Sequence, residues 1–358
     1  MLTILKNAWY AAAYSDEVGE QPLARTLVGE KFVLFRQADG GPAILPDRCP
    51  HRFAPLSEGR VVEDAIECPY HGLRFDGAGH CVFNPHTPAK GPLRAANVRA
   101  LPVMERYGIV WFWPGDPNRA DPDELPQIAF LERPEEYAVV HGFLHVRGHY
   151  ELVVDNLLDL SHAAYLHPQF FDAQYSVQDL YAATEHRLER HKRSLVNHRI
   201  RSGLGPPSAC IEVFGMDEHK PVHTDSTMTW YAPAMLDLAA GSWEMGKERE
   251  TGVHLPQLHI ITPETEFTSH YFFISGRNRR RDDPAIDRAM LEFFNLAFSQ
   301  QDEPMIEMVQ SNMGPVSDIN ELGPILLPID AAPVTARRIL ASLIAEEEGG
   351  AQAIAAAG

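Results

Sequence analysis

The fold of the first third of this 358-residue chain is decided by two short stretches, Cys49-Pro50-His51-Arg52 and Cys68-Pro69-Tyr70-His71-Gly72. Each stretch carries one thiol and one imidazole a few residues apart, and its proline or glycine tightens the turn. Two thiolates and two imidazoles form a four-ligand set that suits zinc or an iron–sulfur cluster. The sequence therefore predicts a metal centre held by Cys49, His51, Cys68 and His71.

Zinc is the alternative to a cluster at this centre. Zinc ribbons usually use Cys-x₂-Cys knuckles rather than Cys-x-His pairs, so the spacing favours a [2Fe–2S] cluster of Rieske type. In such a centre one iron takes both thiolates and the other takes both imidazoles. The stretch from Cys68 to Asp76 closely resembles the second cluster loop of the Rieske family.

A second set of metal-binding side chains lies in residues 151–167, which form an apolar, helix-like run. At 3.6 residues per turn, Asp155, Asp159 and His162 fall on one stripe of such a helix. Two acids and a histidine are costly to bury unless something neutralises them, and a bound cation would do so. The alternative is a structural helix that binds no metal and whose histidines are hydrogen-bonded in the core.

His167 lies five residues beyond His162, too far round a regular helix to share its metal. Pro168 disfavours helical geometry at His167, so we expect the helix to end there and let His167 turn inward. Two histidines and one carboxylate form the facial triad of non-haem Fe(II) oxygenases. The spacing Asp159-x₂-His162-x₄-His167 resembles the iron motif of the Rieske non-haem iron oxygenases.

The third ligand of that triad is predicted within residues 298–307. The family typically shows an acidic pair followed by Met-Ile-Glu or a similar run, and anchoring on Met305-Ile306-Glu307 selects Asp302. Two residues depart from the family motif: Gln301 stands where an acid is usual, and Pro304 interrupts the run. Glu303 therefore remains the alternative carboxylate ligand.

Nearly the whole chain resembles the oxygenase components of the vanillate O-demethylase group, which includes dicamba O-demethylase and toluenesulfonate methyl-monooxygenase. The resemblance is carried by Asn7-Ala8-Trp9-Tyr10, residues 110–116, residues 155–162 and Thr262-Pro263-Glu264-Thr265. It implies a helix-grip (START-like) catalytic domain, in which a curved antiparallel sheet wraps a long helix. It also implies a homotrimer and catalytic roles for Asn156 and Asp159, the latter as an acid that bridges to His71 of a neighbouring subunit.

The predicted fold class is α+β, with an antiparallel β domain first and the helix-grip domain second. We expect the cluster domain at 1–115, a proline-rich linker at 116–126, the catalytic domain at 127–348 and a frayed Ala/Gly-rich tail at 349–358.

Composition excludes several classes of function. The net charge of −18 disfavours nucleic acid and anionic membranes as partners. We find no apolar run of 18 residues and no secretory signal, so a cytoplasmic enzyme is expected. Cys81 and Cys210 are given no ligand role.

The predicted activity is that of a terminal monooxygenase. It uses O₂ and electrons from NAD(P)H, supplied by a ferredoxin or flavin reductase, to hydroxylate or dealkylate a small aromatic. Hydroxylation of a methoxy or N-alkyl carbon gives a hemiacetal or hemiaminal, which collapses to release an aldehyde. Alternatives are ring cis-dihydroxylation and pure electron transfer, the second disfavoured by the His162/His167 motif. The sequence does not identify the substrate.

Overall fold

The computed structural model describes residues 2–87, 91–167 and 175–357. The chain forms two compact units, and each has its own core. The first unit comprises residues 1–125 and the segment Thr262–Glu266, and the second comprises residues 126–261 and 267–358. Pro168 and Gly358 lie outside the described residues.

The first unit consists of three small antiparallel sheets, as its short strand-like runs between glycine and proline turns predict. Their strand orders are β1-β10-β9, β2-β3-β4 and β5-β6-β7-β8. The strands are β1 (Tyr10–Tyr14), β2 (Leu23–Leu27), β3 (Glu30–Arg36), β4 (Pro42–Pro46), β5 (Arg60–Val62), β6 (Ala65–Glu67), β7 (Arg74–Asp76), β8 (Cys81–Phe83), β9 (Val103–Arg106) and β10 (Ile109–Phe112).

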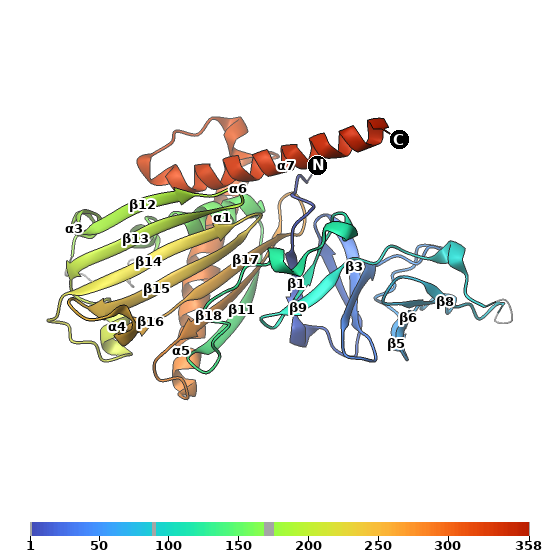
Figure 1. Ribbon diagram of the computed structural model, residues 1–358, viewed down its shortest axis with the longest axis horizontal. Coiled ribbons are helices and arrows are strands. Elements are labelled where there is room, and N and C mark those ends of the chain that lie inside the picture. The colour runs from blue at the N-terminus through green and yellow to red at the C-terminus, as the bar shows by residue number, and fades with distance from the viewer. Residues whose placement is uncertain (1, 88–90, 168–174, 358) are drawn as a thin grey trace. The chain divides into compact units, whose positions relative to one another are not determined.

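The second unit is built on one large antiparallel sheet, ordered β11-β18-β17-β15-β14-β13-β12, with β16 paired to β15 (Figure 1). This agrees with the predicted α+β class. The strands are β11 (Ala138–Val146), β12 (Thr184–Arg190), β13 (Ser194–Leu204), β14 (Val222–Tyr231), β15 (Met235–Glu244), β16 (Val253–His254), β17 (Gln257–Pro263) and β18 (Ser269–Arg277).

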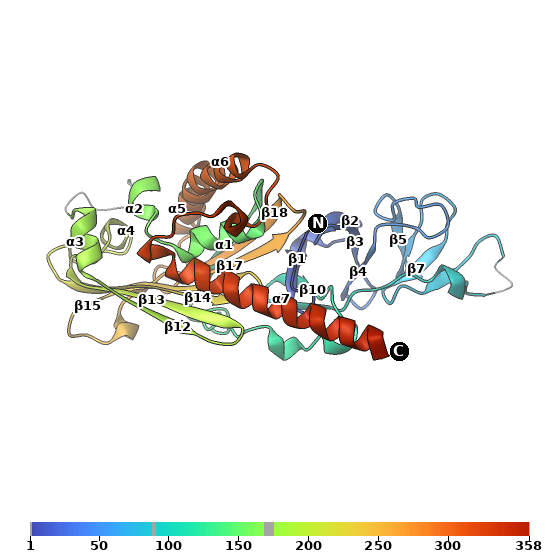
Figure 2. The ribbon, with the colours of Figure 1, turned by 90° about the horizontal axis from the view of Figure 1, so that it is seen from above.

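Helices cover one face of this sheet (Figure 2). The long element consists of α5 (Pro284–Phe294), the π-helical segment η8 (Asn295–Asp302) and α6 (Glu303–Met313), and it corresponds to the long helix that the helix-grip resemblance implies. Phe298 of η8 packs against Tyr271 and Phe273 of β18. The other helices are α1 (Tyr150–Leu158), α2 (Ala163–Leu166), α3 (Val177–Ala182), α4 (Ser208–Glu212) and α7 (Ala331–Ala357).

The strand register shows which side chains line the face that the helices cover. Asn197 of β13 donates a hydrogen bond to the Leu158 carbonyl of α1, 3.1 Å away, so its side of the strand faces the helices. Because side chains alternate along a strand, Arg199 and Arg201 point the same way. We call this surface the inner face of the sheet.

The helix predicted across 151–167 is interrupted. α1 ends at Leu158 and α2 begins only at Ala163. The Asp159 carboxylate accepts a hydrogen bond from the Ser161 backbone N–H at 2.9 Å. A short acidic side chain that bonds its own backbone in this way competes with helical hydrogen bonds. The break sets the directions of the side chains that follow it.

Two predicted boundaries need correction. Most of the expected linker, up to Leu125, belongs to the first unit, where Trp9 Nε1 donates a hydrogen bond to the Asp121 carbonyl at 2.8 Å. The tail expected to fray after Gly349 is helical as far as Ala357. Its alanines have the highest helix propensity of all residues, which offsets the glycine pair at 349–350. No helix among the described residues is long and apolar enough to cross a membrane.

Candidate metal centres

The two cluster loops of the first unit share one backbone design. In the first loop the Cys49 carbonyl accepts a hydrogen bond from Phe53 N–H at 2.9 Å, and in the second the Cys68 carbonyl accepts one from Gly72 N–H at 3.0 Å. The donor residue has a positive φ in both loops, 60° at Phe53 and 70° at Gly72. Each cysteine therefore begins a tight turn, and this turn directs the histidine that follows the cysteine towards the other loop.

The two loops place the two thiols next to each other and the two imidazoles next to each other. The Cys49 and Cys68 side chains are buried next to each other, whereas the rings of His51 and His71 lie nearer the surface with centroids 4.5 Å apart. Burial, together with the neighbouring Cys68, raises the pKa of the Cys49 thiol to about 11, although the backbone N–H groups of His51 and Arg52 favour its thiolate. Buried thiols that must ionise to bind need a compensating cation. One thiol pair and one imidazole pair fit a two-iron cluster with unlike irons.

We predict that Cys68→Ala removes the cluster completely, because a single remaining thiolate cannot hold its iron. The purified variant should lose its brown colour and the reduced-state EPR signal of Rieske type. The matched control is Cys81→Ala, which removes an equally buried thiol from the same unit and should keep both signals. A wild-type protein that contains zinc and lacks acid-labile sulfide would overturn the cluster assignment.

The second centre lies in the second unit, where three predicted ligands converge. Ligand atoms of His162, His167 and Asp302 all lie within 4.8 Å of one another. Asp302 Oδ1 is 3.4 Å from His162 Nε2 and 3.2 Å from His167 Nε2. Metal–ligand bonds of about 2.0–2.2 Å put neighbouring ligand atoms about 3 Å apart. The donor set and its spacing therefore fit a facial triad for ferrous iron.

Hydrogen bonds orient each of the three side chains. Asn156 Nδ2 donates to Asp302 Oδ1 at 3.2 Å, and His167 Nδ1 is 2.7 Å from Gln301 Oε1. His162 Nδ1 lies 2.5 Å from the Asp159 backbone carbonyl. Outer contacts of this kind fix which imidazole nitrogen faces the metal. In both histidines Nε2 is the atom left to bind.

The charges at the site favour a bound cation. Burial disfavours the protonated form of His162, but the hydrogen bond and charge of Asp302 outweigh it, so its pKa lies above the ordinary value. A metal ion would take the place of this proton. On β17, burial lowers the pKa of His259 to about 3 against the opposing charge of Asp302, and its Nδ1 lies 2.8 Å from the Tyr271 hydroxyl. His259 is therefore a neutral polar group near the carboxylate.

The single stripe predicted for Asp155, Asp159 and His162 was wrong in detail. The Asp159 group that meets His162 is its backbone carbonyl, while its carboxylate caps the turn at Ser161. Asp155 does not share the metal stripe, because it pairs with Arg337 of α7 at 2.7 Å. Both differences follow from the end of the helix at Leu158.

The geometry favours Asp302 over Glu303 as the carboxylate ligand. Asp302 is 5% exposed and directed at both histidines, whereas Glu303 is only half-buried and its pKa is raised by burial and by Glu307. We predict that Asp302→Ala loses the mononuclear iron and turnover, and that Glu303→Ala keeps its iron content. Iron analysis of the two variants checks this, and iron loss from Glu303→Ala alone would shift the assignment by one residue.

Gln301 and His259 are site residues that the sequence reasoning did not find. Gln301 was noted only as a departure from the usual acid, although a metal-bound imidazole generally needs an outer partner. His259 carries no local signal, because it reaches the site through the pairing of β17 with β15.

A cluster centre and a mononuclear iron site in one chain define an oxygen-activating iron enzyme. Residues 8–103 match the model of the Rieske [2Fe–2S] domain, and residues 146–346 match that of the vanillate O-demethylase oxygenase C-terminal domain. The chain therefore belongs to the Rieske oxygenases of the vanillate O-demethylase group, and it is an oxygen-dependent oxidoreductase of the monooxygenase type.

Similar proteins extend over the full length of the chain. It is 39% identical to the oxygenase component of dicamba O-demethylase from Stenotrophomonas maltophilia, over 96% of this chain and 98% of that protein. It is 36% identical to the oxygenase component of chloroacetanilide N-alkylformylase from Rhizorhabdus wittichii, over 96% of each. A crystal structure of dicamba monooxygenase with non-haem iron and dicamba has a TM-score of 0.84 and 36% identity, covering 97% of this chain and 99% of the other.

Proposed function

We propose that this chain is the terminal oxygenase that hydroxylates or oxidatively dealkylates a small aromatic compound, by O- or N-dealkylation or methyl hydroxylation. The observation that carries the proposal is the convergence of His162, His167 and Asp302 in a chain that also has the paired cluster loops. The names of the similar proteins, dicamba O-demethylase and chloroacetanilide N-alkylformylase, support dealkylation over ring cis-dihydroxylation.

Each centre has a defined set of proposed ligands. Cys49 and Cys68 would bind one iron of the cluster, His51 and His71 the other, and the facial triad would bind the mononuclear iron. When bound, these groups supply electron transfer and O₂ activation at the triad. The chain's own contribution is to orient the ligands: Asn156 holds the Asp302 carboxylate, and Gln301 holds His167.

The deciding experiment is a panel of aromatic methoxy, N-alkyl and methyl compounds, assayed with a compatible reductase and NAD(P)H. Dealkylation predicts O₂ uptake matched by formaldehyde or another aldehyde, together with a phenol or amine. A diol product carrying both atoms of O₂ would favour cis-dihydroxylation instead. Holoenzyme with both centres and no O₂ uptake on any compound would count against the proposal.

We further propose a cytoplasmic homotrimer that receives electrons through a ferredoxin or flavin reductase. An apolar surface supports self-association, because Ile325 is 91% exposed and Leu322, Leu326 and Leu327 are each more than half exposed. A contiguous exposed apolar stretch of this kind marks an interaction surface. Light scattering on the purified protein should give three times the mass of one chain.

A further inference from the structure

The His167 ring is held at both of its nitrogens by two consecutive residues of η8. Gln301 Oε1 lies 2.7 Å from Nδ1, and Asp302 Oδ1 lies 3.2 Å from Nε2 on the other side of the ring. These two residues end the π-helical segment, and π-helical turns are frequent at functional sites. Because Nε2 is the atom left to bind a metal, Nδ1 carries the ring proton and donates it to the Gln301 amide oxygen.

The acceptors that hold the two histidine rings carry no charge. His167 Nδ1 faces an amide oxygen, and His162 Nδ1 faces the backbone carbonyl of Asp159. The Asp159 carboxylate accepts the Ser161 backbone N–H instead. Among the three ligands and these two acceptors, Asp302 therefore supplies the single negative charge.

The charge of an outer acceptor changes an imidazole as a ligand. A carboxylate acceptor draws the Nδ1 proton towards itself and makes Nε2 more basic, whereas a neutral amide oxygen leaves the proton on the ring. A more basic ligand stabilises ferric iron more than ferrous iron, because the ferric ion carries the larger charge. A neutral acceptor therefore favours the ferrous ion, which is the oxidation state that the facial triad takes in the non-haem oxygenases.

We propose that Gln301 is a positioning residue that keeps His167 a neutral ligand and so favours the ferrous state of the mononuclear iron. The amide orients the ring as a carboxylate would, but it adds no negative charge to the site. Gln301 is half-buried, so a charge at this position would be only weakly screened by solvent. The inference rests on the proposed facial triad and goes beyond it, because it assigns control of the oxidation state to a residue that is not a ligand.

The test replaces Gln301 by glutamate, which keeps the shape of the side chain and adds one negative charge. In a redox titration of the holoenzyme, followed by the EPR signal of high-spin ferric iron, Gln301→Glu should lower the midpoint potential of the mononuclear iron by about 59 mV or more. For one electron, that shift corresponds to a tenfold gain of the ferric over the ferrous state. After chelation of the mononuclear iron, Gln301→Glu should bind Co(II) at least as tightly as wild type does.

A second variant and a control separate the charge from the contact. Gln301→Leu removes the acceptor and should weaken Co(II) binding by about 10–100-fold. The matched control is Gln300→Glu, which adds the same charge at the exposed neighbouring residue and should leave both Co(II) binding and the potential as in wild type. Gln301→Glu alone decides the inference if Gln301→Leu does not fold.

An unchanged potential in Gln301→Glu would overturn the inference and leave Gln301 with a purely structural role. An equal shift in Gln300→Glu would overturn it as well, because the effect would then not depend on the contact with His167. Neither measurement needs turnover, so a shifted potential without dealkylation of any compound would refute only the proposed activity. A wild-type protein that binds neither iron nor Co(II) outside the cluster would overturn the facial triad and this inference together.

Discussion

The His167→Ala variant is expected to lose the mononuclear iron and all detectable turnover while the cluster spectrum stays unchanged. His167 is 6% exposed, its Nε2 lies 3.2 Å from Asp302 Oδ1, and Gln301 fixes its ring. Alanine would leave two protein ligands, too few for a facial triad. Iron analysis should fall from about three to about two atoms per chain, because only the cluster pair is retained.

The control for this loss is His219→Ala, since the His219 side chain is 85% exposed and its ionic partner is the neighbouring Glu218. That variant should keep its iron and its turnover. Unchanged iron content and activity in His167→Ala would show that His167 is not a ligand. Simultaneous loss of the cluster signal would instead indicate general misfolding of the variant.

The cluster loops could be predicted from sequence because each is a local turn. The residues from Cys68 to Gly72 specify both the ligand and the positive φ that closes the turn, and Phe53 adopts the same conformation in the first loop. The His162/His167 pair was found for a similar reason, because both lie within one turn-forming segment. Ligands that a local turn brings together can be recognised from their spacing in the sequence.

The carboxylate ligand needed the structure. Asp302 and Glu303 are adjacent, and helical periodicity separates them only if the phase of the helix is known. The π-helical segment Asn295–Asp302 shifts that phase just before the site. Periodicity also placed Asp155 on the metal stripe, although the helix ends at Leu158 and Asp155 pairs with Arg337.

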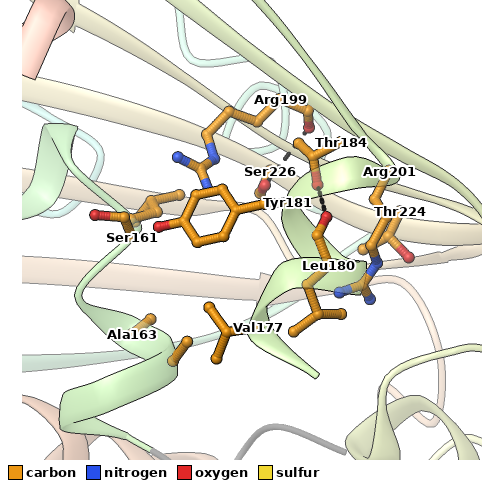
Figure 3. A pocket seen from close by; sticks show the side chains of 12 residues that line it. Ser161, Ala163, Val177, Leu180, Tyr181, Thr184, Arg199, Arg201, Thr224 and Ser226 are labelled. Atoms are coloured by element: carbon orange, nitrogen blue, oxygen red, sulfur yellow. Dashed lines mark hydrogen bonds between the residues drawn. The ribbon is translucent and has the colours of Figure 1, made fainter. Parts of the chain in front are cut away.

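Contacts across the sheet could not be predicted at all. Arg199 lies more than thirty residues beyond His162 in the chain, and it lines the same pocket as Ser161 (Figure 3) only because β13 packs against the end of α1. His259 depends in the same way on the register of β17. Such positions carry no local pattern, because their neighbours are set by strand order.

The Asp159→Asn variant is expected to keep both metal centres and to lose nearly all turnover, by about 100-fold or more, at the upper end for residues that support metal ligands. The amide oxygen of asparagine can still accept the Ser161 N–H bond, and the backbone carbonyl that holds His162 is unchanged. The turn should therefore persist. What disappears is one negative charge, which the resemblance to the family assigns to the contact with His71 of a neighbouring subunit.

Three measurements separate this effect from simple damage: iron content, the EPR signal of the cluster, and the rate at which substrate-bound enzyme oxidises a pre-reduced cluster. The first two should match wild type and only the third should fall. Asp217→Asn, at an acid that makes the same turn contact but at the surface, is the matched control and should leave all three unchanged. A wild-type oxidation rate in Asp159→Asn would remove Asp159 from the electron path.

Electron transfer between subunits predicts a second result, which mixed trimers can test. In the proposed homotrimer, Cys68→Ala would lack the cluster and His162→Ala would lack the mononuclear iron, so neither variant should turn over alone. Co-expression of the two chains gives mixed trimers, in which some neighbours pair an intact cluster with an intact iron site. Those trimers should regain part of the wild-type activity if electrons cross the subunit interface. Verified mixed trimers with no activity would instead confine electron transfer to the single chain.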